Sequence, residues 1–366
     1  MEKINVGVIG CGNISGIYFT NLTGVFSGSV NVYACADLIE DNVRAAAEKY
    51  GIPHIMTLDE MLVCKDIQII LNITTPLSHY SINKQALLAG KHVYCEKPLA
   101  ITFEEGEELC KIAKEKGLLL GCAPDTFMGA GIQTCRKLID EGKIGRPVGG
   151  NAFMMCHGHE GWHPNPAFYY KKGAGPMFDM GPYYLTALVN LLGPISEIAM
   201  MNSRGFETRT ITSQPRNGEV VDVEVQTHVC GLMRFECGAI VNITTSFDVW
   251  KHSMPNIELY GTDGSIGVPD PNCFGGTVRL AAPGKDFEEV PLTHSFAENS
   301  RGIGVANMAA CILGKSKAFR AGGDIALHVL EAMCAMTQNG AGVYKMRTKP
   351  QIIAPLSERY EDGVIV

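Results

Sequence analysis

The sequence predicts an α/β protein in which a doubly wound parallel sheet precedes an α+β domain with a large, mostly antiparallel open sheet. Three observations predict it. Apolar runs of strand composition alternate with helical segments as far as about residue 124. A glycine-rich turn follows the first run. Beyond residue 125, short strands separated by Gly-rich turns replace the alternation. We therefore expect domains over residues 1–124 and 125–366, which suits a chain of this length.

The first predicted strand, residues 4–9, leads directly into a glycine turn. Gly10 permits the tight turn, and Gly12 lets a pyrophosphate approach the backbone because it has no side chain. Residues 14–22 can form the helix whose free N–H groups and positive dipole end would face the phosphates. The third position of the usual fingerprint is Ser15, so an ordinary glycine turn between strand and helix is the alternative interpretation.

The second predicted strand, residues 30–36, ends at Asp37. This carboxylate can accept hydrogen bonds from both hydroxyls of an adenosine ribose and would repel a 2′-phosphate. Leu38 and Ile39 follow, with no arginine to accommodate that phosphate. Strand, turn, helix and acid together predict a Rossmann domain that binds NAD in preference to NADP. The cofactor contacts expected here are Gly10, Gly12, Asn13, Ile14 and Asp37.

The remainder of the first domain continues the alternation. Thr57 and Thr102 are expected helix N-caps, the second in a capping box with Glu105. The solidly apolar run over residues 67–73 is typical of a parallel strand buried on both faces. Helices are predicted over 42–50, 57–63, 78–89 and 102–116, and further strands over 67–73, 92–95 and 118–122.

The second domain is predicted to combine helices with a series of antiparallel strands. Helices are expected over 131–141, 180–192, 303–313 and 324–338, and strands over 148–156, 197–202, 223–233, 240–247, 256–261 and 277–281. An open sheet needs its outer face covered. We therefore expect that face to form a homodimer or homotetramer interface.

Composition narrows the classes of function. The net charge of −7 and the lack of a Lys/Arg cluster argue against a nucleic-acid partner, and no apolar run is long enough to span a bilayer. The first residues run straight into a predicted strand, so we expect no signal peptide. None of the 13 cysteines forms a C-x-x-C pair and most lie in apolar runs, so we expect reduced thiols in a cytoplasmic protein.

Two further motifs stand at predicted strand ends, where α/β sheets bind ligands. The first is Asn72-Ile-Thr-Thr-Pro76 with His79, and the second is Cys95-Glu96-Lys97-Pro98. Lys97 can project into the cleft beneath the nicotinamide; a solvated turn lysine is the alternative. The cofactor contacts expected from these motifs are Thr74, Pro76, His79, Glu96 and Lys97.

With these motifs, the chain resembles the Gfo/Idh/MocA oxidoreductase family. VIGCGNIS, Thr75-Pro76 with His79, Glu96-Lys97-Pro98 and GAGPMFDMGPYYLTALVNLLG over 173–193 fall in the family's order. The resemblance covers essentially the whole length. It implies a Rossmann domain plus an α/β domain whose sheet mediates oligomers. It also implies NAD(P)-dependent oxidation or reduction of a secondary hydroxyl on sugars, cyclitols and related polyols.

One departure from the family pattern concerns its acid/base group. The family's helix motif carries Asp, Gly, a catalytic His and a second Asp. Asp179 and Gly181 match, but Tyr183 stands at the His position and Thr186 at the second Asp. A catalytic His cannot be carried over to this place.

The loop over residues 156–166 offers replacements, because it contains three histidines. An imidazole suits the transfer of a hydroxyl proton, since its pKa is near neutrality. Lys97, made less basic by burial or a nearby cation, is another candidate base. Our hypothesis is that Lys97 and His163 share proton transfer, Asp179 orients Lys97 or a sugar hydroxyl, and Tyr183 binds substrate or relays the proton.

The same loop suggests substrate contacts. Three histidines and one cysteine within eight residues could also ligate zinc, but hydride chemistry in the family needs no metal, so none is predicted. Aromatic side chains there and in residues 168–170 offer flat faces to a pyranose ring or an aromatic aglycone, unless they pack in the core. The predicted substrate contacts are His157, His159, Trp162, Asp179 and Tyr183.

The leading interpretation is NAD-dependent oxidation of a secondary hydroxyl of a sugar or glycoside to a keto-sugar. The Trp-His-Pro-Asn-Pro loop with the Asp-Met-Gly-Pro-Tyr-Tyr helix is similar to a bacterial subgroup that includes enzymes oxidising carbon 3 of glucosides, among them enzymes that start C-glycoside deglycosylation. Inositol or polyol dehydrogenation is an alternative. Two others are redox-assisted glycoside cleavage and a non-catalytic NAD-bound regulator; the intact Glu96-Lys97-Pro98 argues against the regulator.

Overall fold

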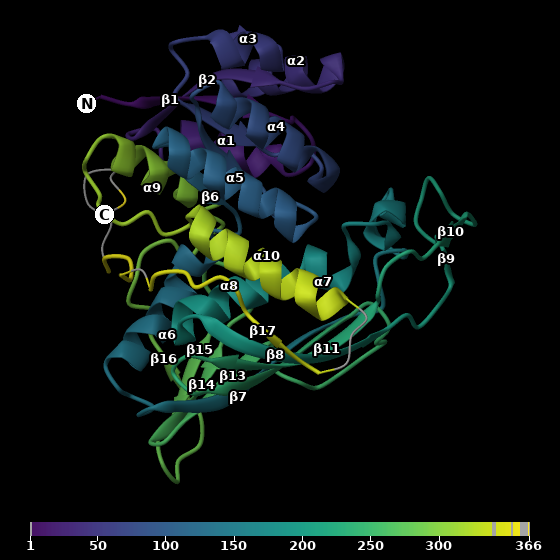
Figure 1. Cartoon of the computed structure of the whole chain (residues 1–366), viewed down its shortest axis with the longest axis vertical. Helices are drawn as coiled ribbons and strands as arrows, with labels where there is room; N and C mark the ends of the chain where they lie inside the picture. The colour runs from purple at the N-terminus through teal and green to yellow at the C-terminus, as the bar shows by residue number, and fades with distance from the viewer. Residues whose placement is uncertain (1, 339–341, 353, 359–364, 366) are drawn as a thin grey trace.

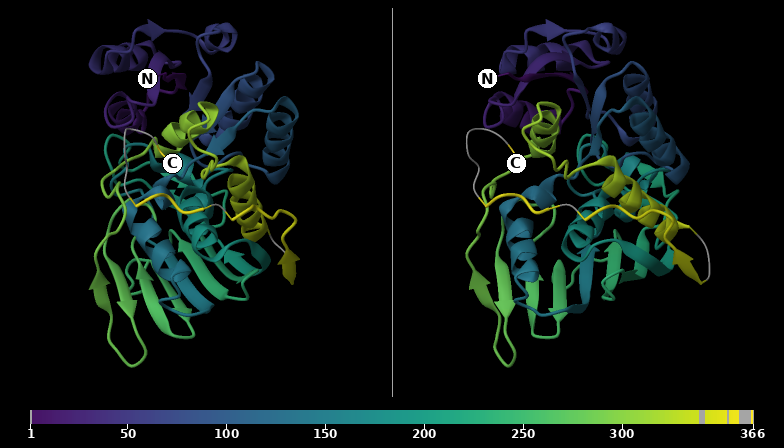
Figure 2. Two further views of the ribbon diagram at one scale, coloured as in Figure 1. Left: turned by 90° about the vertical axis from the view of Figure 1, so that its left-hand side faces the viewer. Right: turned by 60° about the vertical axis from the view of Figure 1, so that its left-hand side comes forward.

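The fold consists of two sheets with helices between them. The computed structural model describes residues 2–338, 342–352, 354–358 and 365. Figure 1 shows the N-terminal sheet, purple to blue, at the top and the second sheet, teal to green, at the bottom. Helix α10 (Gly323–Thr337) lies between them and packs on both α5 (Phe103–Lys116) and β8 (Ile195–Ser203), an arrangement also visible in Figure 2. One continuous cluster of buried apolar side chains runs through both halves.

The first sheet confirms the predicted doubly wound parallel architecture. Its six strands in the described chain run in the order β3-β2-β1-β4-β5-β6, all parallel. The strands are β1 (Ile4–Ile9), β2 (Val30–Ala36), β3 (His54–Ile55), β4 (Ile69–Asn72), β5 (His92–Cys95) and β6 (Leu120–Cys122). The helices are α1 (Ser15–Thr23), α2 (Glu40–Tyr50), α3 (Leu58–Val63), α4 (Pro76–Leu88) and α5. Because the strand order reverses between β1 and β4, their carboxyl ends are the expected ligand-binding edge.

The two predicted threonine caps differ in the structure. Thr57 closes a complete capping box, in which the Glu60 carboxylate accepts from the Thr57 N–H at 2.7 Å. The Thr102 hydroxyl accepts from the Glu105 N–H at 3.3 Å. The Glu105 carboxylate, however, accepts from the N–H of Ile101 at 3.2 Å. The capping box predicted at Thr102 is therefore wrong in one of its two hydrogen bonds. The Glu105 carboxylate accepts from the N–H of Ile101, the residue before the cap, and not from the N–H of Thr102.

The second sheet confirms the large, mostly antiparallel sheet. In the described residues its order is β16-β15-β14-β13-β7-β12-β11-β8-β17, with β7 and β12 paired in parallel. The other strands of this half are β7 (Pro147–Met155), β9 (Thr208–Thr210), β10 (Val220–Asp222), β11 (His228–Phe235), β12 (Ile240–Ser246), β13 (Ile257–Gly261), β14 (Gly264–Val268), β15 (Val278–Ala281), β16 (Glu288–Val290) and β17 (Val343–Lys345). The helices are α6 (Ala130–Asp140), α7 (Gly175–Asp179), α8 (Gly181–Leu192), α9 (Ile303–Ile312) and α10. Helices α6, α8 and α10 cover one face of the sheet.

Some predicted boundaries in this half are wrong. The strand predicted over 223–233 begins only at His228, because the chain before it belongs to an arm formed by β9 and β10. The N–H of Val223 donates to the carbonyl of Glu207 within that arm, at 2.9 Å. The helix predicted over 180–192 is confirmed as α8 to within one residue, and a separate short helix, α7, ends just before it at Asp179. The sequence of β14 has too many small residues to signal a strand, yet it completes a hairpin with β13.

The chain returns to the first sheet after residue 300. The N–H of Cys122 donates to the carbonyl of Ala321 at 3.0 Å. The buried Asp125 carboxylate accepts from the N–H groups of Gly302 and Gly304, at 2.9 and 3.1 Å, and so caps α9. The segment beyond residue 300 thus packs on the N-terminal half, although it is distant in sequence. None of the helices in the described ranges is long and apolar enough to cross a membrane.

Candidate active site

A cleft of about 830 Å³ lies at the edge where the first sheet changes strand order. Its walls come from the turns after β1, β2 and β4 and from the start of α3. Six predicted cofactor contacts line it: Gly10, Gly12, Asn13, Ile14, Asp37 and Thr74. The other four, Pro76, His79, Glu96 and Lys97, lie outside its walls.

The two glycines of the turn have different structural roles. Gly10 has φ +104°, and a Cβ there would lie 2.7 Å from the carbonyl oxygen of Ile73. This position therefore requires glycine for the turn itself. A Cβ at Gly12 would meet no protein atom within 4 Å and would project into open space. Gly12 thus leaves room for a ligand, as an approaching pyrophosphate requires.

The Asp37 side chain stabilises the glycine turn after β1 by hydrogen bonding. One carboxylate oxygen accepts from the N–H of Cys11 at 2.6 Å, and the other accepts from the N–H of Ile39 at 2.8 Å. Each oxygen keeps a further lone pair, so the carboxylate can still accept from ribose hydroxyls. The residues present therefore fit the adenosine half of an NAD molecule.

A second group of polar side chains surrounds the end of β5. The Lys97 ammonium donates to the Asp179 carboxylate at 2.8 Å and to the Asp179 carbonyl oxygen at 2.7 Å. It also lies 5.3 Å from the centre of the Tyr183 ring. Burial alone would lower the pKa of Lys97, but Asp179, Tyr183 and Glu96 raise it well above its usual value. Lys97 is thus a fixed cation, and the idea that burial makes it less basic is wrong.

His159 stands on the other side of the same carboxylate. Its Nε2 lies 3.6 Å from the second Asp179 oxygen, and its ring stacks on Tyr169 at 3.8 Å between centroids. Burial lowers the pKa of His159, and Asp179 only partly opposes this. The imidazole is therefore neutral near pH 7 and can accept a proton. Its Nδ1 is buried without a partner.

The other two predicted histidines are placed elsewhere. The Nδ1 of His163 accepts from the N–H of Asn165 at 3.0 Å, and its ring makes edge contacts with Trp162, Phe168 and Tyr169. His157 stacks on Trp250 at 3.4 Å, beside Arg209. The structure thus brings His159, and not His163, to the carboxylate that holds Lys97. Sequence spacing could not separate them, because all three lie in one loop.

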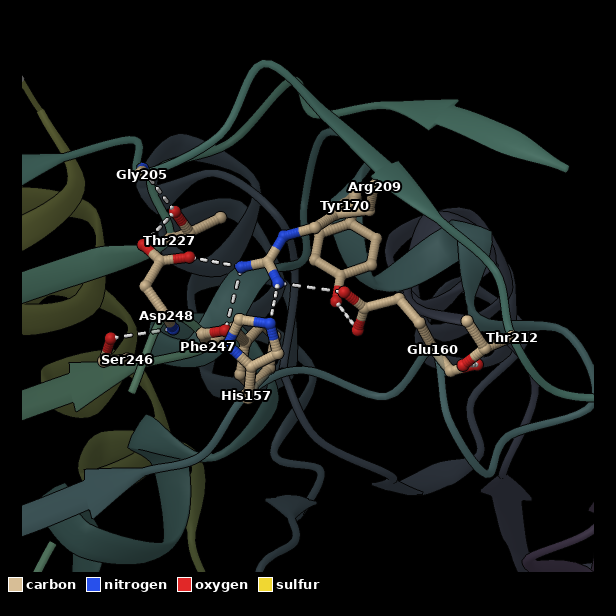
Figure 3. A network of polar contacts seen from close by, with 10 residues as sticks. All are labelled: His157, Glu160, Tyr170, Gly205, Arg209, Thr212, Thr227, Ser246, Phe247 and Asp248. Carbon is tan, nitrogen blue, oxygen red and sulfur yellow. Dashed lines mark hydrogen bonds and ion pairs between the residues drawn. The ribbon is translucent and has the colours of Figure 1, made fainter. Parts of the chain in front are cut away.

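Arg209 anchors that loop (Figure 3). It is 4% exposed and donates to the Glu160 carboxylate at 2.9 Å, to the carbonyl of Phe247 at 2.8 Å, and to the Asp248 carboxylate. Tyr170 donates to the same Glu160. The loop and the segment that follows β12 therefore meet the arm of β9 and β10 at one guanidinium. Nothing in the sequence near Arg209 signals this role.

Tyr183 is buried, so its pKa is raised, although Lys97 and Arg301 act in the opposite direction. Arg301 precedes α9 and is itself held by the carbonyl and side chain of Asn272. The sequence offers no signal for Arg301 at this site.

Trp162, a predicted substrate contact, is 65% exposed and lies 5.3 Å from His159, ring to ring. Within the described residues, no group of His, Cys, Asp and Glu side chains is arranged to hold a metal ion.

Comparisons with known proteins agree with this geometry. Residues 4–123 match the family described as "Oxidoreductase family, NAD-binding Rossmann fold", and residues 132–267 match "GFO/IDH/MocA C-terminal domain". A solved levoglucosan dehydrogenase in complex with NADH is similar in fold, with a TM-score of 0.77 at 20% identity over 92% of this chain and 96% of that one. An NAD-binding oxidoreductase from Klebsiella pneumoniae gives 0.79 at 20% identity over 91% and 96%.

Three of the curated relatives are sugar or glycoside dehydrogenases by name. D-glucoside 3-dehydrogenase of Escherichia coli is 26% identical over 71% of this chain and 75% of that protein. Levoglucosan dehydrogenase of Pseudarthrobacter phenanthrenivorans is 26% identical over 73% of each. D-xylose dehydrogenase of Paenarthrobacter nicotinovorans is 30% identical over 46% and 45%. D-xylose dehydrogenase and three other curated relatives, two uncharacterized oxidoreductases of Schizosaccharomyces pombe and the 1,5-anhydro-D-fructose reductase of Ensifer adhaerens, are matched over only 45 to 63% of their length.

The two turn glycines give a matched test of the cofactor cleft. We expect Gly12→Ala to fold normally but to bind NADH about tenfold or more weakly, because its methyl group occupies the ligand's space. Gly10→Ala should lose roughly 1 to 3 kcal/mol of unfolding free energy, because alanine rarely adopts its backbone conformation. Calorimetric titration with NADH and thermal unfolding measure the two effects. Undiminished NADH affinity in a folded Gly12→Ala protein would place the cofactor elsewhere.

Proposed function

Since the chain belongs to the Gfo/Idh/MocA family of oxidoreductases, we propose that it transfers a hydride between NAD and a carbon that bears a secondary hydroxyl of a sugar or glycoside. One observation carries the proposal. Lys97 and His159 approach opposite oxygens of Asp179, at 2.8 and 3.6 Å, beyond the edge where the sheet forms its NAD cleft. In alcohol oxidation a neutral base can take the hydroxyl proton, and a fixed cation can stabilise the negative charge that develops on the oxygen.

The roles follow from the protonation states. Bound NAD supplies the hydride acceptor. The Lys97 ammonium donates a hydrogen bond to the reacting oxygen and stabilises the negative charge that develops there. His159 takes the hydroxyl proton, because it is neutral and its ring is held by Tyr169. Asp179 positions both groups, and the hydroxyl of Tyr183 contacts the substrate beside Lys97. This replaces His163 with His159 in the sharing of proton transfer.

Carbon 3 of a glucosyl unit is the finer proposal. It is supported by the likeness to proteins named D-glucoside 3-dehydrogenase and levoglucosan dehydrogenase. Inositol dehydrogenation is the runner-up, because proteins of that name are also similar. The Lys97–Asp179–His159 group argues against a non-catalytic regulator, since a regulator needs no such arrangement. Redox-assisted glycoside cleavage would use the same first step and would release an aglycone.

A product screen tests the proposal. The purified protein, with and without added NAD, should convert methyl glucoside or a related glycoside to a product two hydrogens lighter, detected by mass spectrometry. NMR spectra of the product then identify the carbon that was oxidised. A keto-inositol alone would favour the runner-up, and a released aglycone would favour cleavage. No oxidised product from any sugar, cyclitol or glycoside would contradict the proposal.

The two loop histidines provide a matched pair. His159→Asn should lower kcat about a hundredfold or more, because the proton acceptor is removed. His163→Asn should retain most of the activity, since that ring does not reach Asp179. Steady-state kinetics at saturating NAD and NADH titration of both variants are the measurements. Equal losses in the two variants, or a larger loss in His163→Asn, would contradict the assignment.

We also propose a homodimer or homotetramer that covers the outer face of the second sheet. Strand register places Met201, Leu232, Ile240 and Val343 on one face, and these side chains are 42 to 83% exposed. Exposed apolar groups on one face mark an interaction surface. Sedimentation should show that Leu232→Glu with Met201→Glu dissociates the oligomer. Leu77→Glu, at an exposed apolar residue of α4, is the control and should leave it intact.

A further inference from the structure

His79 on α4 is a buried titratable group that lies outside the proposed reacting centre. Its side chain is fully buried. Its Nδ1 lies 2.7 Å from the carbonyl oxygen of Pro98, and its Nε2 lies 3.1 Å from the carbonyl oxygen of Thr74. A carbonyl oxygen can only accept a hydrogen bond, so each ring nitrogen must carry a hydrogen. Neutral imidazole has one N–H, and both contacts together therefore require the imidazolium.

A second fully buried histidine, His328, has the opposite protonation state. The Nε2 of His328 accepts from the N–H of Ile195 at 2.9 Å, which only an unprotonated nitrogen can do. Burial lowers the pKa of His328 to about 4. For His79, burial also acts to lower the pKa, but the facing Cys95 sulfur and the two carbonyls outweigh it and raise the pKa to about 9. Full burial thus gives opposite protonation states according to the hydrogen-bond partners.

The two carbonyl groups belong to two turns of the candidate active site, one at the NAD cleft and one beside Lys97. Thr74 follows β4 and lines the NAD cleft, whereas Pro98 directly follows Lys97. Their strands are neighbours, with Asn72 opposite Cys95 in the register. The Asn72 side chain holds the first turn from within, because its oxygen accepts from the N–H and hydroxyl of Thr74 at 3.2 and 2.7 Å. The His79 ring connects this turn to the turn formed by Lys97 and Pro98.

We propose that His79 is a buried imidazolium and a positioning residue: it ties the Thr74 turn to the Lys97–Pro98 turn and so sets the Lys97 ammonium relative to the NAD cleft. The ring's titratable neighbour is Cys95 on β5, which in turn interacts with Cys122 on β6. Desolvation raises the pKa of Cys95, but Cys122 and the charge of His79 lower it overall. A thiolate there would compensate the buried positive charge. The effect on catalysis rests on the proposed function, whereas the charge of the ring does not.

The protonation state can be measured directly on the full-length protein. Long-range ¹H–¹⁵N correlation spectra of ¹⁵N-histidine-labelled protein at pH 7.5 should show both His79 nitrogens with protonated-type shifts, persisting until the pH approaches about 9. His328 should show one unprotonated nitrogen under the same conditions. His79→Gln and His328→Gln assign the signals. If His79→Gln does not fold, Cys95→Ala assigns His79, because it removes the sulfur that faces this ring. One unprotonated His79 nitrogen at pH 7.5 would overturn the proposal.

The kinetics and cofactor affinity of one variant test the positioning role. His79→Gln should bind NADH more weakly and lower kcat about tenfold or more, because the ring no longer ties the Thr74 turn to the Lys97–Pro98 turn. Unchanged NADH affinity and kcat in the folded variant would overturn the proposal. Loss of NADH affinity without any sugar oxidation in wild type would refute only the proposed function.

Discussion

The ion pair between Lys97 and Asp179 is the contact on which the rest of the site depends. It joins the end of β5 in the first half of the chain to α7 in the second. Both side chains are less than a fifth exposed, and buried charges are stable only when additional hydrogen bonds satisfy them. The ammonium therefore also bonds to the Asp179 carbonyl, and the second carboxylate oxygen faces His159. These contacts fix the two halves of the site relative to each other.

One carboxylate gives its two neighbours different protonation states. Burial acts to lower the pKa of both Lys97 and His159, and Asp179 acts to raise both. For Lys97 the attraction wins, because its contact is 2.8 Å and includes a hydrogen bond. For His159 the distance is 3.6 Å and desolvation wins. A fixed cation and a neutral proton acceptor can therefore stand side by side at the same pH.

Local sequence predicted the first sheet well, but it could not tell which histidine of the 156–166 loop lies beside Asp179. Gly10, Gly12 and Asp37 could be placed, because their spacing follows from the strand–turn–helix geometry that each requires. The choice between His159 and His163 depends on how a loop without regular structure folds. That loop is held by Arg209, some 50 residues away in the chain and on an arm whose strands the sequence does not signal. Long-range ion pairs of this kind have no local pattern from which to be predicted.

Polar groups at three neighbouring strand ends explain why distant segments meet here. Asn72, Glu96 and Asp125 follow or end β4, β5 and β6, and all three are buried. Burial raises the pKa of Asp125 to about 6, even with two N–H donors from the start of α9. Glu96 likewise needs its bond from Tyr18 on α1. Because such groups are costly when unpaired, α1 and α9 must dock at this edge. Docking of α9 brings Arg301 to Tyr183, so the pairing of buried polar groups at the sheet edge also determines which side chains surround the Lys97 ammonium.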